Sequence, residues 1–188
     1  DPNFPQDSYH VDNDRGRSNF DARQRLTASG SWLLPSLRAA GKWLSVFSLN
    51  GILTLQTGRP FTVALPADLD NSGTGRANLG FGANDRPNLV GKAQLSNPTA
   101  DRWFNTSAFA IGPKGTFGNA GRNILDGPGL ASFNLSLLKT VAIRESLSVQ
   151  LRAESFNLFN RTNLDLPNNF LGGAGFGAIS TAQNPRHI

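Results

Sequence analysis

The sequence of 188 residues contains no cysteine and no methionine. Without cysteine the chain can form neither a disulfide nor a thiolate metal site. The absence of methionine, even at position 1, indicates a piece of a longer protein or a processed product, so any signal peptide is expected upstream. No apolar run approaches the roughly 20 residues of a membrane helix. That absence does not argue against a membrane β-barrel, because barrel strands alternate between apolar and polar residues.

The chain also lacks a concentration of charge. It has 18 basic and 13 acidic residues, and its net charge is +5. The arginines are scattered from Arg15 to Arg186 without forming a cluster. Nucleic-acid binding needs a basic stripe or a binding motif, so the sequence predicts no nucleic-acid partner.

Residues that carry catalysis are scarce as well. The two histidines, His10 and His187, lie near the chain ends, and no G-x-S-x-G motif accompanies them. Glu145 and Glu154 are the only glutamates, which leaves a paired-carboxylate glycosidase without its parts. The stretch "GTGRAN" (73–78) has Asn78 where a dinucleotide loop needs its third glycine. We therefore expect no enzymatic activity and no cofactor.

One stretch resembles a metal-binding loop. In "DLDNSG" (68–73), Asp68 and Asp70 match the first half of the calcium loop of an EF-hand. The twelfth position is Leu79, where a bidentate glutamate is required. A calcium site with a loop geometry of its own therefore stays the weaker alternative to a solvated turn, and no other metal site is predicted.

The sequence does contain strand-like alternation. In "LSVQLRAESFNLFN" (147–160), apolar residues occupy the odd positions from Leu147 to Ala153, and polar residues occupy the even ones up to Glu154. Side chains of a strand alternate between its faces, so such a stretch has one apolar and one polar face. The same reasoning predicts strands over about 25–34, 43–57, 132–141, 146–157 and 177–188.

The lengths of the connections follow a pattern. The links after the first and third strands are short, whereas a long irregular region over 58–130, rich in glycine and asparagine, follows the second strand. Short turns at one end and long loops at the other are typical of outer-membrane barrels. Trp32 and Trp43 flank the same short turn, as aromatic residues at a membrane interface do. A tryptophan cluster in the core of a soluble sandwich is the alternative for this pair.

Several stretches together resemble a known family. They are "FDARQRLTASGSWLLP" (20–35), "LNGILTLQTGRPFTV" (49–63), "DRPNLVG" (85–91), "WFNTSAFA" (103–110), "GTFGNAGRNILDGPG" (115–129), "FNLSLLKT" (133–140) and "LRAESFNLFNRTNL" (151–164). In this order they resemble the C-terminal barrel part of a TonB-dependent receptor, of the Oar-like group that carries a carboxypeptidase-regulatory-like domain.

The resemblance implies an all-β fold of antiparallel up-and-down strands. Residues 1–188 would form a partial segment of a large outer-membrane barrel of about 22 strands, with long external loops such as 58–130. Such receptors import a scarce nutrient (a siderophore, carbohydrate or peptide) across the cell outer membrane. Energy comes from the TonB complex, which acts through a plug domain that this chain lacks.

The resemblance also implies which residues meet lipid. The lipid-facing side chains would be Leu49, Leu53, Leu135, Leu147, Val149 and Leu151. The lumen-facing side chains would be Asn50, Gln150, Arg152 and Glu154. The alternative is a soluble β-sandwich binding module, carbohydrate-binding or adhesin-like, in which the same apolar faces would share one core.

Overall fold

The computed structural model describes residues 4–34, 47–75, 84–144 and 146–188. Within them the regular secondary structure is almost entirely antiparallel β-strand, as predicted. The helical segments there are two short 3-10 turns, η1 (Val11–Asp14) and η5 (Thr106–Ala108). No helix of the described residues has the length and apolar character needed to cross a membrane. The chain divides into two compact units.

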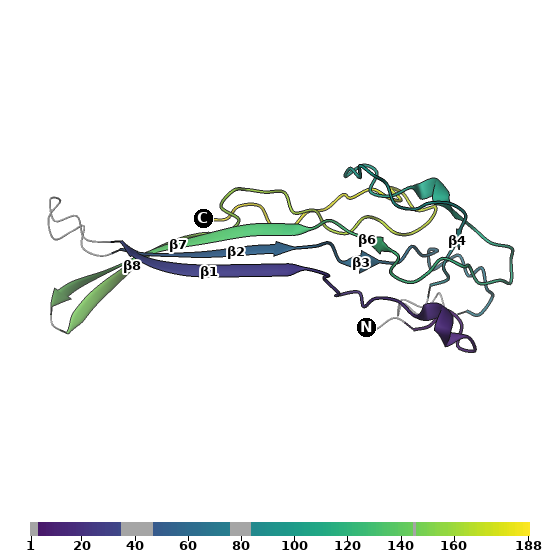
Figure 1. The fold of residues 1–188 in the computed structure, drawn as a ribbon, viewed down its shortest axis with the longest axis horizontal. Helices are drawn as coiled ribbons and strands as arrows, with labels where there is room; N and C mark the ends of the chain where they lie inside the picture. The colour runs from purple at the N-terminus through teal and green to yellow at the C-terminus, as the bar shows by residue number, and fades with distance from the viewer. Residues whose placement is uncertain (1–3, 35–46, 76–83, 145) are drawn as a thin grey trace. The chain divides into compact units, whose positions relative to one another are not determined.

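One unit comprises Gln24–Thr57, Leu130–Asn163 and Gln183–Ile188, and we call it the sheet unit. Its four long strands form a single antiparallel sheet, seen as neighbouring arrows in Figure 1. In pairing order they are β1 (Arg25–Leu34), β2 (Phe47–Gln56), β7 (Leu130–Arg144) and β8 (Leu147–Ser155). β1 has the predicted bounds, whereas β7 extends beyond the predicted 132–141. The sheet is open, because its edge strands β1 and β8 do not pair with each other.

The register sorts side chains into two faces. One row across all four strands is apolar and consists of Trp32, Leu49, Leu137 and Ala153. The next row is polar and consists of Ser31, Asn50, Ser136 and Glu154. Paired residues share a face and successive residues alternate, so the sheet has one largely apolar and one largely polar face. On the apolar face the Phe133 ring covers Gly51, where an added Cβ would lie 3.3 Å from Cζ.

The long connections depart from one end of this sheet. Gln56, the last residue of β2, pairs with Arg25 at the start of β1 and with Leu130 at the start of β7. At the opposite end Leu34 pairs with Phe47, and β7 is followed closely by β8. The segment between β2 and β7 therefore leaves and re-enters the sheet at the same end, which is the arrangement that the alternating loop lengths predicted.

The predicted strand over 177–188 is not formed as a continuous ladder. Phe156 and His187 form an isolated antiparallel bridge, and their reciprocal N–H···O bonds measure 2.8 and 3.2 Å. Residues 177–182 of the predicted strand belong to the other unit. There the Ala178 carbonyl accepts the Asn168 N–H at 2.8 Å. A backbone group bonded there is not available to extend the sheet. Pro185 also has no N–H to donate to a ladder.

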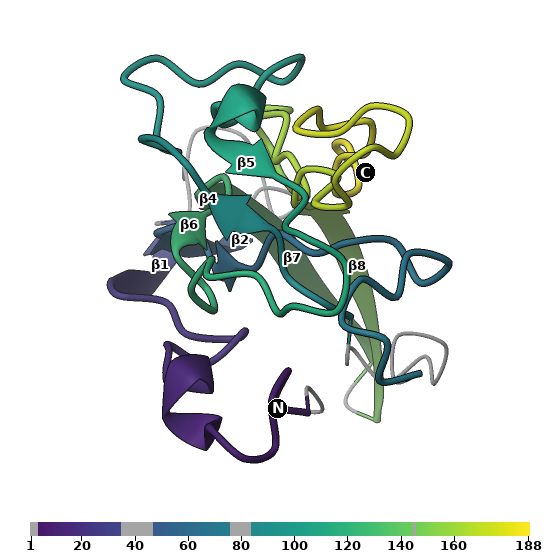
Figure 2. The ribbon, with the colours of Figure 1, turned by 90° about the vertical axis from the view of Figure 1, so that its right-hand side faces the viewer.

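The other unit comprises Asp1–Arg23, Gly58–Gly129 and Leu164–Ala182, and we call it the loop unit. Its described strands are short: β3 (Pro60–Phe61) pairs with β6 (Leu125–Asp126), and β4 (Asn88–Leu89) pairs with β5 (Phe109–Ala110). β4 and β5 are visible side by side in Figure 2. These strand pairs do not supply the second extended sheet that the sandwich alternative requires.

The loop unit has a hydrophobic core of its own. The Phe104 ring lies at its centre, with the rings of Phe61, Phe109 and Phe176 at centroid distances of 5.7, 5.8 and 5.2 Å. Val63, Ala108 and Leu125 are also buried in this cluster. The region over 58–130 has little regular secondary structure, as expected, but it contains a buried core that the sequence analysis did not predict. Its phenylalanines are spread along the sequence without strand-like alternation, and they meet only after the chain folds.

Candidate functional site

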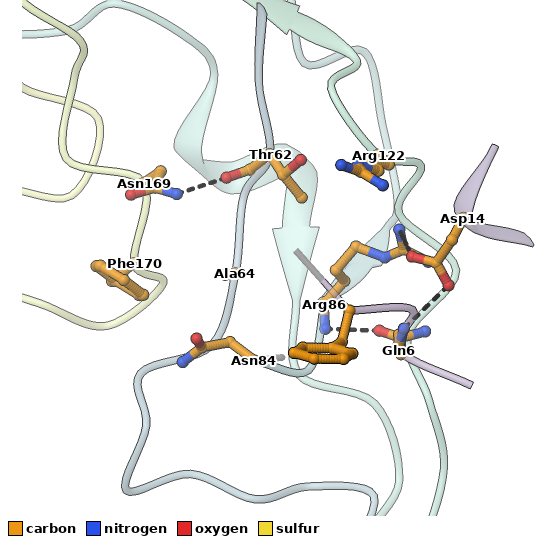
Figure 3. Close-up of a pocket in the computed structure, with 10 residues that line it drawn as sticks. Gln6, Asp14, Thr62, Ala64, Asn84, Arg86, Arg122, Asn169 and Phe170 are labelled. Atoms are coloured by element: carbon orange, nitrogen blue, oxygen red, sulfur yellow. Dashed lines mark hydrogen bonds and ion pairs between the residues drawn. The ribbon is translucent and has the colours of Figure 1, made fainter. Parts of the chain in front are cut away.

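A polar pocket of about 140 Å³ lies within the loop unit (Figure 3). Residues from the N-terminal segment, from 62–64, 84–86 and 169–170, and Arg122 line it. No predicted site residue is among them. All of these stretches belong to one compact unit, so the geometry of the pocket is defined by contacts within that unit.

The backbone of residues 62–65 forms the central wall of the pocket. The Ala64 N–H donates to the Asn169 carbonyl at 3.0 Å, and the Ala64 carbonyl accepts the Leu171 N–H at 2.9 Å. On the other side the Leu65 N–H donates to the Asp85 carbonyl at 2.7 Å. This pairing holds the 169–170 stretch and the 84–86 stretch on opposite sides of the wall.

Arg86 is the most deeply buried charged side chain of the pocket, with 5 % of its surface exposed. Its Nη1 lies 2.8 Å from Asp14 Oδ1, and its Nη2 donates to the Asn13 carbonyl at 3.2 Å. Gln6 connects the same residues, because its Oε1 accepts the Arg86 N–H at 2.7 Å and its N–H donates to Asp14 Oδ2 at 3.0 Å. A buried charge needs such partners to offset its lost hydration. The network therefore ties the N-terminal segment to the pocket.

The pocket carries a net positive charge. Arg86 and Arg122 face a single carboxylate, that of Asp14, among the lining residues. Burial lowers the pKa of the Arg86 guanidinium from its ordinary value, Asp14 counters this, and the charge of Arg122 lowers the pKa further. Arg86 Nε is buried and has no hydrogen-bond partner among the described residues. The pocket thus has an excess of cationic hydrogen-bond donors.

Two amide side chains complete the polar wall. Asn169 Nδ2 donates to the Thr62 carbonyl at 2.6 Å, and Asn84 Nδ2 donates to the Leu65 carbonyl at 3.0 Å. Thr62 Oγ1 is held in turn by Asn123, whose N–H donates to it at 2.9 Å. These bonds fix the amides in place, so the wall is held by contacts within the protein.

The predicted lipid-facing and lumen-facing residues lie on opposite faces of the sheet unit. The apolar set (Leu49, Leu53, Leu135, Leu147, Val149 and Leu151) shares one face. The polar set (Asn50, Gln150, Arg152 and Glu154) shares the other, where Arg152 Nη2 is ion-paired with Glu154 Oε1. Trp32 lies on the apolar face and is 60 % exposed. Trp43 lies outside the described residues. Which face meets lipid stays a prediction.

The acidic turn at 68–75 uses the Asp70 carboxylate internally. Asp70 Oδ1 accepts the Thr74 N–H at 3.2 Å, and Asp70 Oδ2 accepts the Gly75 N–H at 2.7 Å. Asp68 is exposed and makes no part of this network. Among the described residues no group of three histidine, cysteine, aspartate or glutamate side chains is placed to hold a metal ion. The Asp70 carboxylate is thus engaged by backbone N–H groups of the turn.

Sequence reasoning did not find the pocket, although two of its residues stand in stretches quoted above. Arg86 belongs to "DRPNLVG" and Arg122 to "GTFGNAGRNILDGPG". An arginine inside a glycine- and proline-rich stretch is ordinarily a solvated residue. No local sequence signal distinguishes Arg86, because the burial of Asp85 and Arg86 is known only from the structure.

The comparisons with known proteins point to one family. Residues 1–188 match the model of a family described as an outer membrane beta barrel domain. No curated protein and no solved structure matches the chain.

Proposed function

Because this chain belongs to the outer membrane beta barrel domain family and is located in the outer membrane, we propose that it is part of a TonB-dependent receptor that imports a scarce nutrient. A siderophore, a carbohydrate or a peptide is the class of nutrient proposed. The TonB complex would act through a plug domain elsewhere in the protein, and no catalytic step is involved. The outer-membrane location removes the soluble sandwich as an alternative.

One observation carries this proposal. The sheet unit is an open antiparallel sheet with an apolar face, and its connection from β2 to β7 contributes a hydrophobic core and part of the lining of a polar pocket to the loop unit. A barrel wall whose strands are joined by a connection with a folded core suits a receptor. The ordered resemblance to TonB-dependent receptors narrows the proposal to active import.

The proposed orientation follows from the two faces. The apolar row residues, such as Leu49 and Leu137, would contact outer-membrane lipid. The polar row residues, such as Asn50 and Glu154, would line the lumen against the plug. An apolar band on the lipid side and a polar interior are the usual arrangement of membrane barrels.

The experiment compares nutrient uptake in four strains: wild type, a strain lacking the full-length receptor, a strain lacking TonB, and the double deletion. We expect at least one nutrient whose uptake is lower in the strain that lacks the receptor than in the wild type. Uptake of that nutrient should fall by the same amount in the strain that lacks TonB, and it should fall no further in the double deletion. A nutrient that needs the receptor but enters normally without TonB would contradict active import and leave a passive channel.

A further inference from the structure

We propose that the pocket of the loop unit binds the carboxylate of a small organic acid, so that the nutrient taken by this receptor is an anion or ends in one. The proposal rests on the proposed function and names the substrate class. Figure 3 shows Arg122 and Arg86 on one side of Thr62, with Asn169 and Phe170 on the other. A ligand in this pocket is therefore reached by guanidinium groups from one side and by an amide and a ring from the other.

The charge of the pocket favours an anion over a cation. Both oxygens of Asp14 are already used, Oδ1 by Arg86 Nη1 and Oδ2 by the Gln6 N–H. Among the described residues no second carboxylate lines the pocket. A cation would therefore find no unengaged carboxylate there and would be repelled by two guanidinium groups. A carboxylate would be attracted by both, since guanidinium geometry matches the two oxygens of a carboxylate.

The buried Arg86 Nε provides a second reason. A buried donor without a partner loses the hydrogen bond that it makes in water, and this loss is larger for a charged group. Among the described residues nothing bonds this Nε, and Arg86 itself lines the pocket. Because Nε itself has almost no accessible surface, a bound carboxylate would supply an acceptor after a small rotation of the guanidinium.

The size and the remaining walls describe the rest of the ligand. A volume of about 140 Å³ corresponds to roughly four or five water molecules at about 30 Å³ each. That space holds one acidic unit and not an oligomer. Phe4 and Phe170 line the pocket and are 60 % and 40 % exposed, so a ring or an apolar body can pack against them. Asn84 and Asn169 offer amide groups to hydroxyls or other polar atoms.

The test measures equilibrium binding to the purified full-length receptor in detergent by titration calorimetry. The probes are galacturonate with galactose as its uncharged counterpart, and glutamate with glutamine as its counterpart. We expect at least one acid to bind tenfold or more tightly than its counterpart, and to weaken as salt is raised. Comparison of the two acids distinguishes a sugar acid from an amino acid as the source of the carboxylate.

The variants separate this site from general surface charge. Arg122→Gln is expected to weaken binding of the acid tenfold or more, and Arg122→Lys is expected to restore part of the loss because it restores the charge. Arg102→Gln is the matched control, since Arg102 is exposed, lies in the same unit and donates from its side chain to the nearby Asn105. Equal binding of acid and neutral probes, or equal loss in Arg122→Gln and Arg102→Gln, would overturn the proposal. No step of this assay uses TonB, so its failure is distinct from a failure of the import proposal.

Discussion

The ammonium nitrogen of Lys139 lies 4.6 Å from the centre of the Phe47 ring, and the two residues are paired across β2 and β7. Lys139 belongs to the apolar face, in a row with Leu34, Phe47 and Leu151, yet it is 9 % exposed. A cation can be tolerated on such a face because the electron-rich ring accepts it while the aliphatic stem covers apolar surface.

This pair should show measurable energetic coupling. A double-mutant cycle with Phe47→Leu and Lys139→Met should give a coupling energy of about 1–2 kcal/mol, since the contact is largely desolvated. The measurement is the free energy of unfolding of the full-length receptor in a denaturant titration from lipid vesicles. A coupling energy near zero would mean that the ring does not stabilise the charge.

The two faces of the sheet should differ in their tolerance of charge. Leu137→Arg places a cation in the apolar row between Leu49 and Ala153, and should cost about 2–4 kcal/mol if that face meets the bilayer centre. Ser136→Arg is the control, because it lies one residue away on the polar face, paired with Glu154. Similar losses of unfolding free energy in both variants would contradict the orientation. Leu151 is a poorer probe, since it pairs with Lys139 and a new arginine there would meet a like charge.

The loop unit should depend on its buried ion pair. Asp14→Ala removes the partner of a guanidinium that is 5 % exposed, and loss of one partner of a buried pair costs about 3–5 kcal/mol. Asp126→Ala is the matched change in the Arg17–Asp126 pair, where Asp126 is 49 % exposed and the expected cost is about 0–1 kcal/mol. The readout is the rate at which trypsin digests the loop unit in the solubilised receptor. Equal rates for the two variants would show that the Arg86–Asp14 pair is not structurally important.

The orientation of the sheet can be mapped with introduced cysteines, since the chain has none of its own. Lys114→Cys places a thiol on an exposed turn of the loop unit, and Arg144→Cys places one at the opposite, short-turn end of the sheet. A membrane-impermeant maleimide added to intact cells should label position 114 and should label position 144 only after the outer membrane is permeabilised. The reverse pattern would place the loop unit in the periplasm.

The sequence by itself determined the long strands and their faces. The alternation from Leu147 to Glu154 predicted β8, and the pattern of Arg25 to Leu34 predicted β1 with its observed bounds. Alternation is a local property, because a strand turns successive side chains to opposite sides whatever it pairs with. The lengths of the connections also predicted which strand ends lie together.

The tertiary structure alone decided the loop unit and its pocket. Phe61, Phe104, Phe109 and Phe176 share a core although no periodicity links them, and the pocket joins Gln6 to residues as distant as Asn169. It also decided that residues 177–182 bond within the loop unit and do not extend the sheet. The physical reason is the range of the contacts. A strand face follows from neighbours in the sequence, whereas a buried arginine acquires its partner only when separate stretches of chain are brought together.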